Sequence, residues 1–153
     1  MTCPFCDKKS ENAVFARSEQ ALAVYNISPL LPGHSLIIPK RHVRTIYELS
    51  DSEYEDMVFF MRDVSGLLRK AYKAEGINWT LQEGEAAGQT VSHLHFHLIP
   101  RYSGDFADAG DWYPKLQDHL NIDSAQRPKL TDPQIKETVE WLREKTRAAK
   151  LWK

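Results

Sequence analysis

The stretch GQTVSHLHFHLIPR, residues 88–101, sets three histidines at alternate positions, His93, His95 and His97. Apolar residues stand between and after them. A strand sends successive side chains to opposite faces of a sheet, so this spacing puts the three imidazoles on one face and the apolar side chains on the other. We therefore expect a strand that is anchored through its apolar side and presents its histidines for chemistry.

Several functions suit such a strand, because imidazoles near neutral pH serve as nucleophiles, proton carriers or metal ligands. The simplest interpretation is a polar face in contact with solvent, but three of the chain's six histidines within five residues argue against it. A sharper alternative is a three-histidine zinc site, as in carbonic anhydrase, in which a metal-bound water does the chemistry. Alternation alone does not separate this metal site from a nucleophilic histidine.

Length and charge narrow the class of protein. The 153 residues are enough for one compact domain, residues 1–153, with a core that needs no cross-links. A formal charge of -1 excludes a global basic field for a nucleic-acid backbone. The N-terminus lacks the apolar core of a signal peptide, and no run approaches the roughly 18 apolar residues of a membrane span. We expect a soluble cytoplasmic protein that binds neither nucleic acid nor membranes.

The other predicted strands are short apolar runs bounded by turn signals. Two of them flank a polar turn and predict a hairpin, a third follows a breaker-rich loop and ends at a proline, and a Gly-rich stretch joins the last two. The predicted strands are residues 13–17, 21–26, 34–39, 77–84 and 91–101.

Two helices are predicted. Ser50 followed by Glu53 forms a capping box, and apolar residues then recur at helical spacing, so we expect a long helix over Asp51 to Lys73. A charged C-terminal helix begins near Thr131. The segment from Tyr102 to Leu130 contains two prolines, many aspartates and several aromatic residues, and we interpret it as an ordered loop.

Residues 88–101 resemble the signature of the histidine triad (HIT) superfamily, His-φ-His-φ-His-φ-φ, in which φ is apolar. The φ positions are filled by Leu94, Phe96, Leu98 and Ile99. NISPLLPGHSLIIPKRH, residues 26–42, resembles the family's N-terminal half-site, and QEGEAAGQTVSH, residues 82–93, resembles the fragile histidine triad branch and the bacterial dinucleoside polyphosphate hydrolases. The resemblance covers residues 3–105, whereas residues 106–153 carry no comparable match.

The resemblance implies the HIT-like fold, an α+β domain with an antiparallel sheet of about five strands, one long helix packed on it and a C-terminal helix. It also implies a homodimer, in which the sheets join edge to edge or through the long helices and the C-terminal segment reaches the partner's site. Trp112, Tyr113 and Trp152 are candidates for that contact, with core packing as the simpler interpretation of the first two. His119 has no family counterpart, and we expect it at the surface.

The resemblance also implies catalytic roles for three histidines. The family's central histidine, here His95, attacks the α-phosphorus and forms a nucleotidyl-histidine that water then hydrolyses. A neutral imidazole is a competent nucleophile, so one difficult displacement becomes two easier ones. His97 is expected to hydrogen-bond the phosphate oxygen as charge shifts toward it, and His34 to support the cluster from the neighbouring strand.

Substrate-binding positions follow from the same register. Gln82 and Gln89 match family residues that bind the α-phosphate and the leaving-group side of the substrate. Thr90 matches a hydroxyl residue at the same rim of the site. Gly88 allows the backbone to approach the substrate closely. Asn26 stands where the family hydrogen-bonds the ribose. The residues expected to sandwich the base are Ile27, Phe5 and Leu36. Ordinary core packing is the alternative for these three, above all for Leu36.

The pair Cys3 and Cys6 is a weak signal, since it fits a redox pair, half of a zinc site or two unremarkable cysteines. Many bacterial HIT proteins and the galactose-1-phosphate uridylyltransferases bind structural zinc through such a pair, a histidine after the third strand and the first triad histidine. Here those histidines are His42 and His93. Four protein ligands suit tetrahedral zinc and leave no open position, so this site competes with the three-histidine alternative. No organic cofactor is expected.

The function implied is hydrolysis of dinucleoside polyphosphates, such as diadenosine tri- or tetraphosphate, through the His95 adduct. A purine nucleoside phosphoramidase, acting on adenosine monophosphate amides or aminoacyl adenylates, would use the same nucleophile and is the first alternative. A nucleotide-binding interaction protein without enzymatic activity is the second. His97 argues against the phosphorylase and uridylyltransferase branches, which typically carry glutamine at that position.

Overall fold

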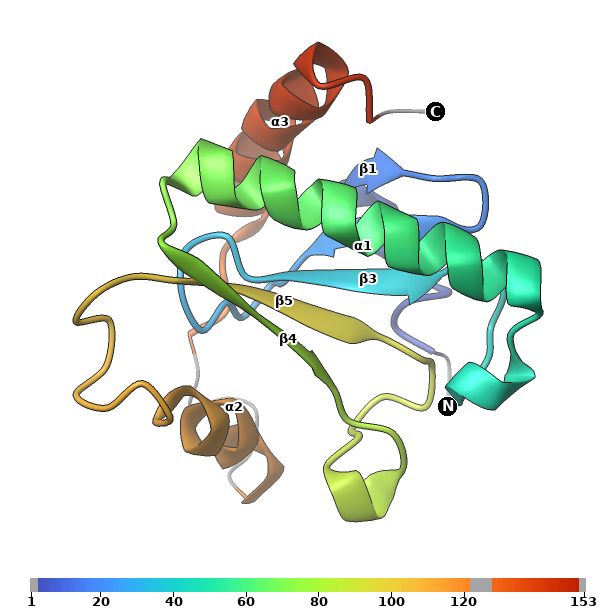
Figure 1. The fold of residues 1–153 in the computed structure, drawn as a ribbon, viewed down its shortest axis with the longest axis horizontal. Coiled ribbons are helices and arrows are strands. Elements are labelled where there is room, and N and C mark those ends of the chain that lie inside the picture. Colours follow the sequence, from blue (N-terminus) through green and yellow to red (C-terminus); the bar gives the residue numbers. More distant parts are fainter. Residues whose placement is uncertain (1–2, 122–127, 152–153) are drawn as a thin grey trace.

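The structure, a computed structural model, describes residues 3–121 and 128–151 (Figure 1). Only the backbone is described for residues 117–121. Trp152 and the side chain of His119 therefore lie outside the described residues. Five strands form one sheet of antiparallel pairs in the order β1-β2-β3-β5-β4. The strands are β1 (Val14–Arg17), β2 (Ala21–Tyr25), β3 (Ser35–Pro39), β4 (Gly76–Leu81) and β5 (Phe96–Arg101). The helices are α1 (Asp51–Tyr72), α2 (Trp112–Asn121) and α3 (Asp132–Ala148), with short 3-10 turns at Lys8–Ala13, Ile46–Glu48 and Glu85–Ala87.

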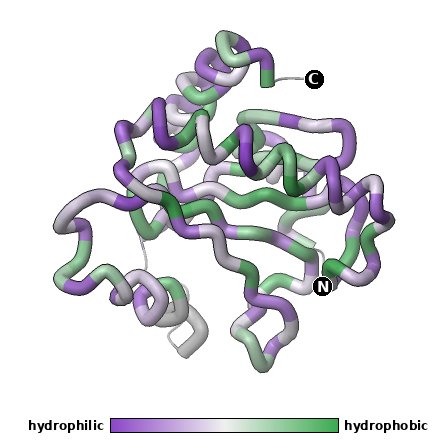
Figure 2. Tube along the Cα trace, in the orientation of Figure 1, coloured by the Kyte–Doolittle hydropathy of each residue, from purple (hydrophilic) through white to green (hydrophobic). Residues whose placement is uncertain are grey.

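Helix α1 begins and packs as its sequence predicts. The hydroxyl of Ser50 accepts from the backbone N–H of Glu53 at 3.2 Å, and the Glu53 carboxylate accepts from the backbone N–H of Ser50 at 2.8 Å. The chain leaves the helix at Lys73, whose φ of 54° is left-handed. The apolar stripe of α1 lies against one face of the sheet, where the hydropathy trace of the strands is mostly hydrophobic (Figure 2). The predicted helix 51–73 is thus confirmed to within one residue.

The two edges of the sheet differ. Helix α3 covers the β1 edge: Arg143 donates from Nε to the carbonyl of Val14 at 2.9 Å, and the hydroxyl of Thr146 donates to the carbonyl of Phe15 at 3.1 Å. At the opposite edge, β4 pairs with β5 and carries no further strand within residues 3–121 and 128–151. One edge is therefore closed by the chain itself and the other is open.

The interpretation of residues 102–130 as a loop is wrong for part of its length, because α2 lies within it. Pro114 falls in the first turn of α2, where a missing backbone N–H removes no intrahelical hydrogen bond. Proline usually breaks a helix, but Pro114 stands at a position where helices tolerate it. Leu116, two residues further on, is 1% exposed and is the buried side of the helix.

A half-buried arginine holds the segment that leads into α2. Arg101, the last residue of β5, donates to both oxygens of Asp105 from Nε at 2.7 Å and Nη2 at 2.9 Å. Its Nη1 donates to Oδ1 of Asn78 at 2.7 Å and to the carbonyl of Ala109 at 3.0 Å. The Arg101 guanidinium holds the pKa of Asp105 down at about 2. Residues 101–109 are therefore fixed to the sheet by charge-assisted hydrogen bonds.

The strand predicted over residues 91–101 is shorter than expected, because β5 begins at Phe96. His93 and His95 precede it, where the backbone N–H of Leu94 donates to the carbonyl of Val43 at 2.7 Å instead of joining the sheet ladder. Strand alternation therefore explains the direction of His97 alone. That direction is away from α1, since the neighbouring pair Trp79 and Leu98 lies on the α1 side.

No helix among the described residues is long and apolar enough to cross a membrane.

Candidate active site

His95 is buried, with 6% of its surface exposed, and its ring is held by the backbone. Its Nδ1 lies 2.8 Å from the carbonyl oxygen of His93. A carbonyl can only accept, so Nδ1 carries the hydrogen and Nε2 carries the lone pair. Burial lowers the pKa of His95, and the hydrogen bond to the carbonyl offsets part of that shift. The imidazole is therefore neutral at pH 7, which is its nucleophilic form.

Two rings flank this imidazole. The Phe5 ring meets that of His95 edge-on, with centroids 5.3 Å apart, and that of His93 at 5.8 Å. The His97 ring lies 5.1 Å from His95. The peptide between the two cysteines thus brings Phe5 against the nucleophile. Contact between Phe5 and a nucleotide base stays a prediction.

His34 lies between His97 and Asn26, and the predicted contact of Asn26 with a ribose stays a prediction. His34 is fully buried just before β3, and its Nε2 lies 2.9 Å from Nδ1 of His97. Nδ1 of His34 accepts from the backbone N–H of Leu30 at 3.0 Å, and Nδ2 of Asn26 lies 3.3 Å from its Nε2. A chain of polar groups thus runs from the loop before β3 to the histidine face of the sheet.

Gln82 and Gln89 make different hydrogen bonds. Gln82 is 5% exposed and donates from Nε2 to the Thr80 hydroxyl at 2.7 Å, and Thr80 is the partner of His97 in the sheet register. Gln89 closes its own loop: its Oε1 accepts from the backbone N–H of Gly84 at 2.8 Å, and its Nε2 donates to the carbonyl of Arg44 at 3.4 Å. Gln82 therefore lies beside the histidines, whereas Gln89 ties residues 84–89 to the loop after β3.

The remaining binding candidates differ in burial. Thr90 is exposed, and Gly88 adopts a φ of 90° that favours glycine. Ile27 is 46% exposed, so its side chain is accessible to a ligand. Leu36 is buried in the main core cluster, in register with His97, which agrees with core packing.

Cys3, Cys6, His42 and His93 come together, with their ligand atoms all within 4.8 Å of one another. Nδ1 of His93 lies 3.5 Å from Sγ of Cys3 and 3.6 Å from Sγ of Cys6, and Nδ1 of His42 lies 3.3 Å from Sγ of Cys6. Zn–S and Zn–N bonds at tetrahedral angles place sulfur and nitrogen about 3.6 Å apart. Nε2 of His93 donates to the carbonyl of Pro39 at 3.0 Å, which turns the Nδ1 lone pair toward the sulfurs. These four residues fit a metal ion.

The carbonyls of His93 and Pro39 are functional groups that the sequence does not reveal. Every residue has a carbonyl, so no residue type marks the two that fix the tautomers of His95 and His93. The spacing between residues 39 and 93 is set by the packing of β3 against β5.

Residues 7–104 match the sequence model of the HIT domain family. The chain belongs to the HIT family. It is similar to a bis(5'-adenosyl)-triphosphatase of Dictyostelium discoideum, with 30% identity over 94% of this chain and 95% of that protein. It is also similar to an asymmetrical bis(5'-nucleosyl)-tetraphosphatase of Schizosaccharomyces pombe, with 39% identity over 68% of this chain and 57% of that protein.

Solved structures show the same HIT fold. A histidine triad nucleotide-binding protein of Sulfolobus tokodaii superposes with a TM-score of 0.75 at 25% identity, over 97% of this chain and 94% of that one. A zinc-bound HIT protein of Mycobacterium smegmatis superposes with a TM-score of 0.70 at 26% identity, over 98% and 96%. The predicted α+β fold with a five-stranded antiparallel sheet is therefore confirmed.

Proposed function

We propose that this HIT protein hydrolyses dinucleoside polyphosphates of the diadenosine tri- and tetraphosphate type. The observation that carries the proposal is the neutral His95, whose hydrogen is held on Nδ1 by the His93 carbonyl so that the Nε2 lone pair is the nucleophile. The relatives named as bis(5'-adenosyl)-triphosphatase and bis(5'-nucleosyl)-tetraphosphatase support this substrate class.

The reaction needs two displacements at one phosphorus. Nε2 of His95 attacks the α-phosphorus, the bond from phosphorus to the bridging oxygen breaks, and the nucleoside di- or triphosphate leaves with the electron pair. The adduct carries positive charge on the imidazole, and the Nδ1–H bond to the His93 carbonyl strengthens as that charge forms. Water then attacks the same phosphorus, the N–P bond breaks, and nucleoside monophosphate leaves. His97, and Gln82 beside it, are the residues we assign to the phosphate oxygens.

Turnover in water labelled with oxygen-18 tests both the substrate class and the bond that breaks. The specificity constants for diadenosine triphosphate and diadenosine tetraphosphate are measured beside that for adenosine 5'-phosphoramidate. We expect the dinucleotides to have the higher values, and the label to enter AMP and not the leaving ADP or ATP. Label in ADP or ATP would show attack on another phosphorus.

The same measurement separates the alternatives. A higher specificity constant for the phosphoramidate would favour the phosphoramidase, and absence of turnover with tight nucleotide binding would favour a binding protein. Either result contradicts the proposed function.

We also propose that the cluster of Cys3, Cys6, His42 and His93 binds zinc as a structural metal. The sulfur–nitrogen distances fit the ion, and the zinc-bound HIT protein of Mycobacterium smegmatis supports the idea. With four protein ligands the ion would hold the N-terminal segment, and with it Phe5, to the segment before β5. Neither cysteine is in a disulfide, in keeping with the cytoplasmic location that we propose.

Metal analysis tests the zinc proposal without any assay of activity. We expect one zinc per chain in the wild type and a loss of bound zinc in Cys3→Ser, because a hydroxyl is a poor zinc ligand at neutral pH. Lys8→Ser, at an exposed position of the same segment, is the control and should keep its zinc. Equal zinc content in the two variants would refute this ligand set.

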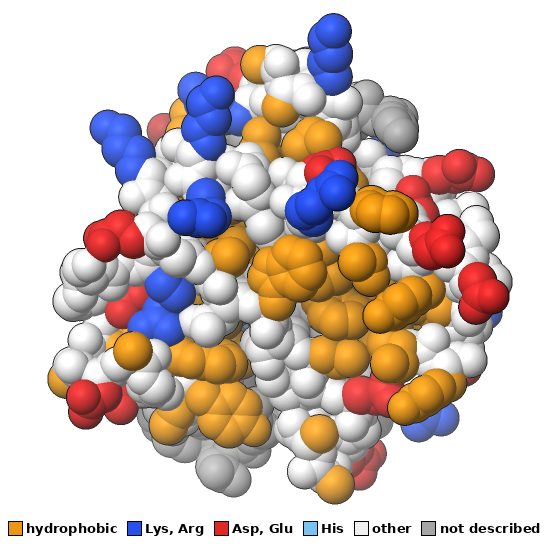
Figure 3. Space-filling model, viewed as in Figure 1, with side chains coloured by type: hydrophobic (Ala, Val, Ile, Leu, Met, Phe, Trp, Pro, Cys, Tyr) orange, Lys and Arg blue, Asp and Glu red, His pale blue; other side chains and the backbone are white. Residues whose placement is uncertain are grey.

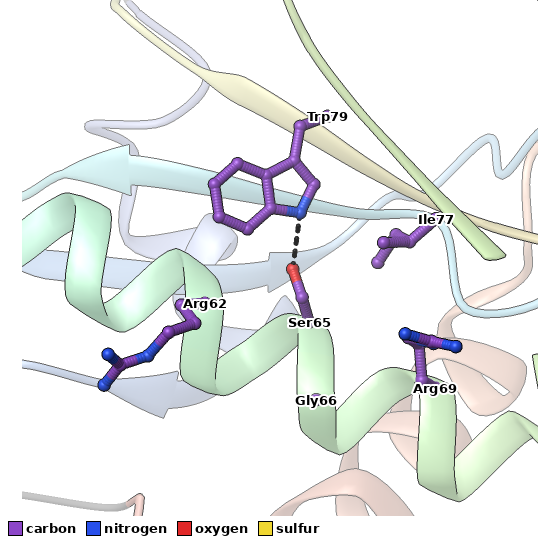
Figure 4. A pocket seen from close by; sticks show the side chains of 6 residues that line it. All are labelled: Arg62, Ser65, Gly66, Arg69, Ile77 and Trp79. Carbon is purple, nitrogen blue, oxygen red and sulfur yellow. Dashed lines mark hydrogen bonds between the residues drawn. The ribbon is translucent and has the colours of Figure 1, made fainter.

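We further propose a homodimer that forms through the open edge of β4 and the exposed side of α1. Hydrophobic side chains gather across the face that α1 covers (Figure 3), and Phe59 is 56% and Trp79 44% exposed. Between α1 and β4 lies an open pocket of about 470 Å³, in which Trp79 donates from its indole nitrogen to the hydroxyl of Ser65 at 2.7 Å (Figure 4). An apolar patch beside an unpaired strand suits a second copy of the same surface.

Molar mass in solution, measured by light scattering, tests the dimer. Phe59→Asp should give a monomer, because it places a charge in the proposed interface. Tyr47→Asp, at an aromatic residue that is 86% exposed in the turn Ile46–Glu48, should leave the mass unchanged. A wild type with the mass of one chain would refute the proposal.

A further inference from the structure

Residues 3–6 form a turn that holds the only two cysteines of the chain. The backbone N–H of Cys6 donates to the carbonyl of Cys3 at 3.1 Å and closes the turn. A β-turn keeps its first and last Cα atoms within about 7 Å, and a disulfide needs Cα atoms about 4.4 to 6.8 Å apart. The two sulfurs belong to the group of ligand atoms that all lie within 4.8 Å of one another. The turn therefore holds the two sulfurs at a spacing that a disulfide can close.

Solvent reaches this pair of sulfurs. Cys6 is exposed and Cys3 is partly exposed, so a small oxidant can approach them in the folded protein. A bound zinc would hold both sulfurs as thiolates, the form that reacts with a hydroperoxide. In the reducing compartment that we propose, disulfides are usually transient and serve catalysis or redox sensing. Reversible oxidation is the chemistry that suits such a pair.

The same turn reaches the nucleophile through Phe5, which stands between the two cysteines. The Phe5 ring meets the rings of His95 and His93 edge-on, with centroids 5.3 and 5.8 Å apart. The sulfurs of Cys3 and Cys6 lie 3.5 and 3.6 Å from Nδ1 of His93. Contacts of the sulfurs thus fasten the turn to the segment that carries the nucleophile. The chemical state of the sulfurs decides how firmly the Phe5 ring is held there.

We propose that Cys3 and Cys6 are a reversible oxidation site. A hydroperoxide converts them to a disulfide, which removes two ligands from the four-residue cluster and loosens Phe5 from His95. The oxidation goes beyond the proposed hydrolase and zinc functions. Its effect on turnover rests on the hydrolase function, and its effect on bound metal rests on the zinc proposal.

The oxidation balances in atoms and electrons. The exposed Cys6 thiolate attacks one oxygen of hydrogen peroxide, the O–O bond breaks, and hydroxide leaves with the electron pair, so that Cys6 becomes a sulfenic acid. The Cys3 thiolate then attacks the Cys6 sulfur, the S–S bond forms, the S–O bond breaks, and a second hydroxide leaves. Each sulfur gives up one electron, and the peroxide takes both. Protons from solvent and from the sulfenic acid turn its oxygens into water.

The intact mass of the folded protein after treatment with hydrogen peroxide tests the disulfide. We expect the wild-type chain to lose the mass of two hydrogen atoms and to regain it with dithiothreitol. Cys6→Ser leaves one thiol in the chain and should not show this loss. A product that has only gained oxygen, or a disulfide that joins two chains, overturns the proposal.

Release of zinc into a colorimetric chelator during the same treatment tests the effect on the cluster. We expect zinc to leave in step with disulfide formation, because the sulfurs of a disulfide are no longer thiolate ligands. A disulfide that forms while zinc stays bound overturns the proposal. A wild type that carries no zinc overturns this part together with the zinc proposal, whereas the intact mass still decides the disulfide.

Turnover of diadenosine triphosphate tests the link to His95. Oxidation should lower kcat/KM of the wild type by about tenfold, the scale expected when a group that orients a site is lost, and dithiothreitol should restore it. Phe5→Ala has no ring to loosen, so its kcat/KM should be low before treatment and should change by less than about twofold on oxidation. Equal sensitivity of the two proteins, or full activity of the oxidised wild type, overturns the link. If neither protein turns over substrate, the hydrolase function fails and the mass and zinc readouts still stand.

Discussion

Strand β5 carries polar side chains at both ends, and the two ends satisfy them in different ways. At the C-terminal end, Arg101 directs four hydrogen bonds at protein acceptors and holds a loop. At the N-terminal end, Nδ1 of His95 donates to the His93 carbonyl, and Nδ1 of His97 lies against Nε2 of His34. The first of these contacts decides the tautomer of His95 and so the chemistry of its second nitrogen. The C-terminal end therefore holds a loop, and we assign the reaction to the N-terminal end.

The largest effect is expected at the N-terminal end. His95→Asn removes the nucleophile, so kcat for diadenosine triphosphate should fall by a factor of the order of 10⁴ or more. Nucleotide binding, measured by calorimetry, should remain largely intact, because the amide preserves a buried polar group of similar length. Persistent turnover in this variant would show that another residue attacks the phosphorus.

An intermediate effect is expected at the C-terminal end. Asp105→Asn leaves the Arg101 guanidinium without its anionic partner, and the unfolding free energy from urea titration should fall by about 2 kcal/mol at pH 7. Activity at saturating substrate should be unchanged while the protein is folded. Asp108→Asn, at an exposed aspartate of the same segment, is the control and should stay within about 0.5 kcal/mol of wild type. If Asp105→Asn lowered kcat as strongly as it lowered stability, the division between the two ends would not hold.

The smallest effect is the pH dependence of that stabilisation. Arg101 lowers the pKa of Asp105 to about 2, from about 3.9 in an unfolded chain. A lowered carboxyl pKa gives stability that is fully present above the unfolded value and is lost as pH falls through the folded value. The stability gap between wild type and Asp105→Asn should thus be constant from pH 5 to 7 and narrow between about pH 4 and 2. A gap that does not change with acid would show that the ion pair contributes nothing.

Much of the fold was predictable because local signals agree with the tertiary structure. The capping box of Ser50 and Glu53 starts α1 where its apolar stripe begins, and the short apolar runs become β1 to β4 within a few residues. Helix α2 was not predictable from its own sequence, since a proline in the first turn and preceding aspartates also describe a loop. The segment before the helix is held by Arg101, and the local sequence does not reveal these contacts.

The side chains of the candidate site were predictable from the sequence, but the ring nitrogen that carries the hydrogen in each histidine was not. Spacing and resemblance point to His34, His95 and His97, and the structure brings all three together. Backbone groups fix which nitrogen of each ring carries the hydrogen: the His93 carbonyl for His95 and the Leu30 N–H for His34. Such groups are present at every residue, so only the folded chain distinguishes the few that matter.

The cover that α3 places on β1 limits how the chain associates. A sheet with two open edges can add copies without end, as fibres do. Here, among the described residues, Arg143 and Thr146 bond to the carbonyls of Val14 and Phe15, and α3 covers β1, so we expect a copy joined at β4 to offer no second sheet edge for a third. Edge pairing therefore stops at two chains. Raising the protein concentration should increase the fraction of dimer and should not lengthen a filament.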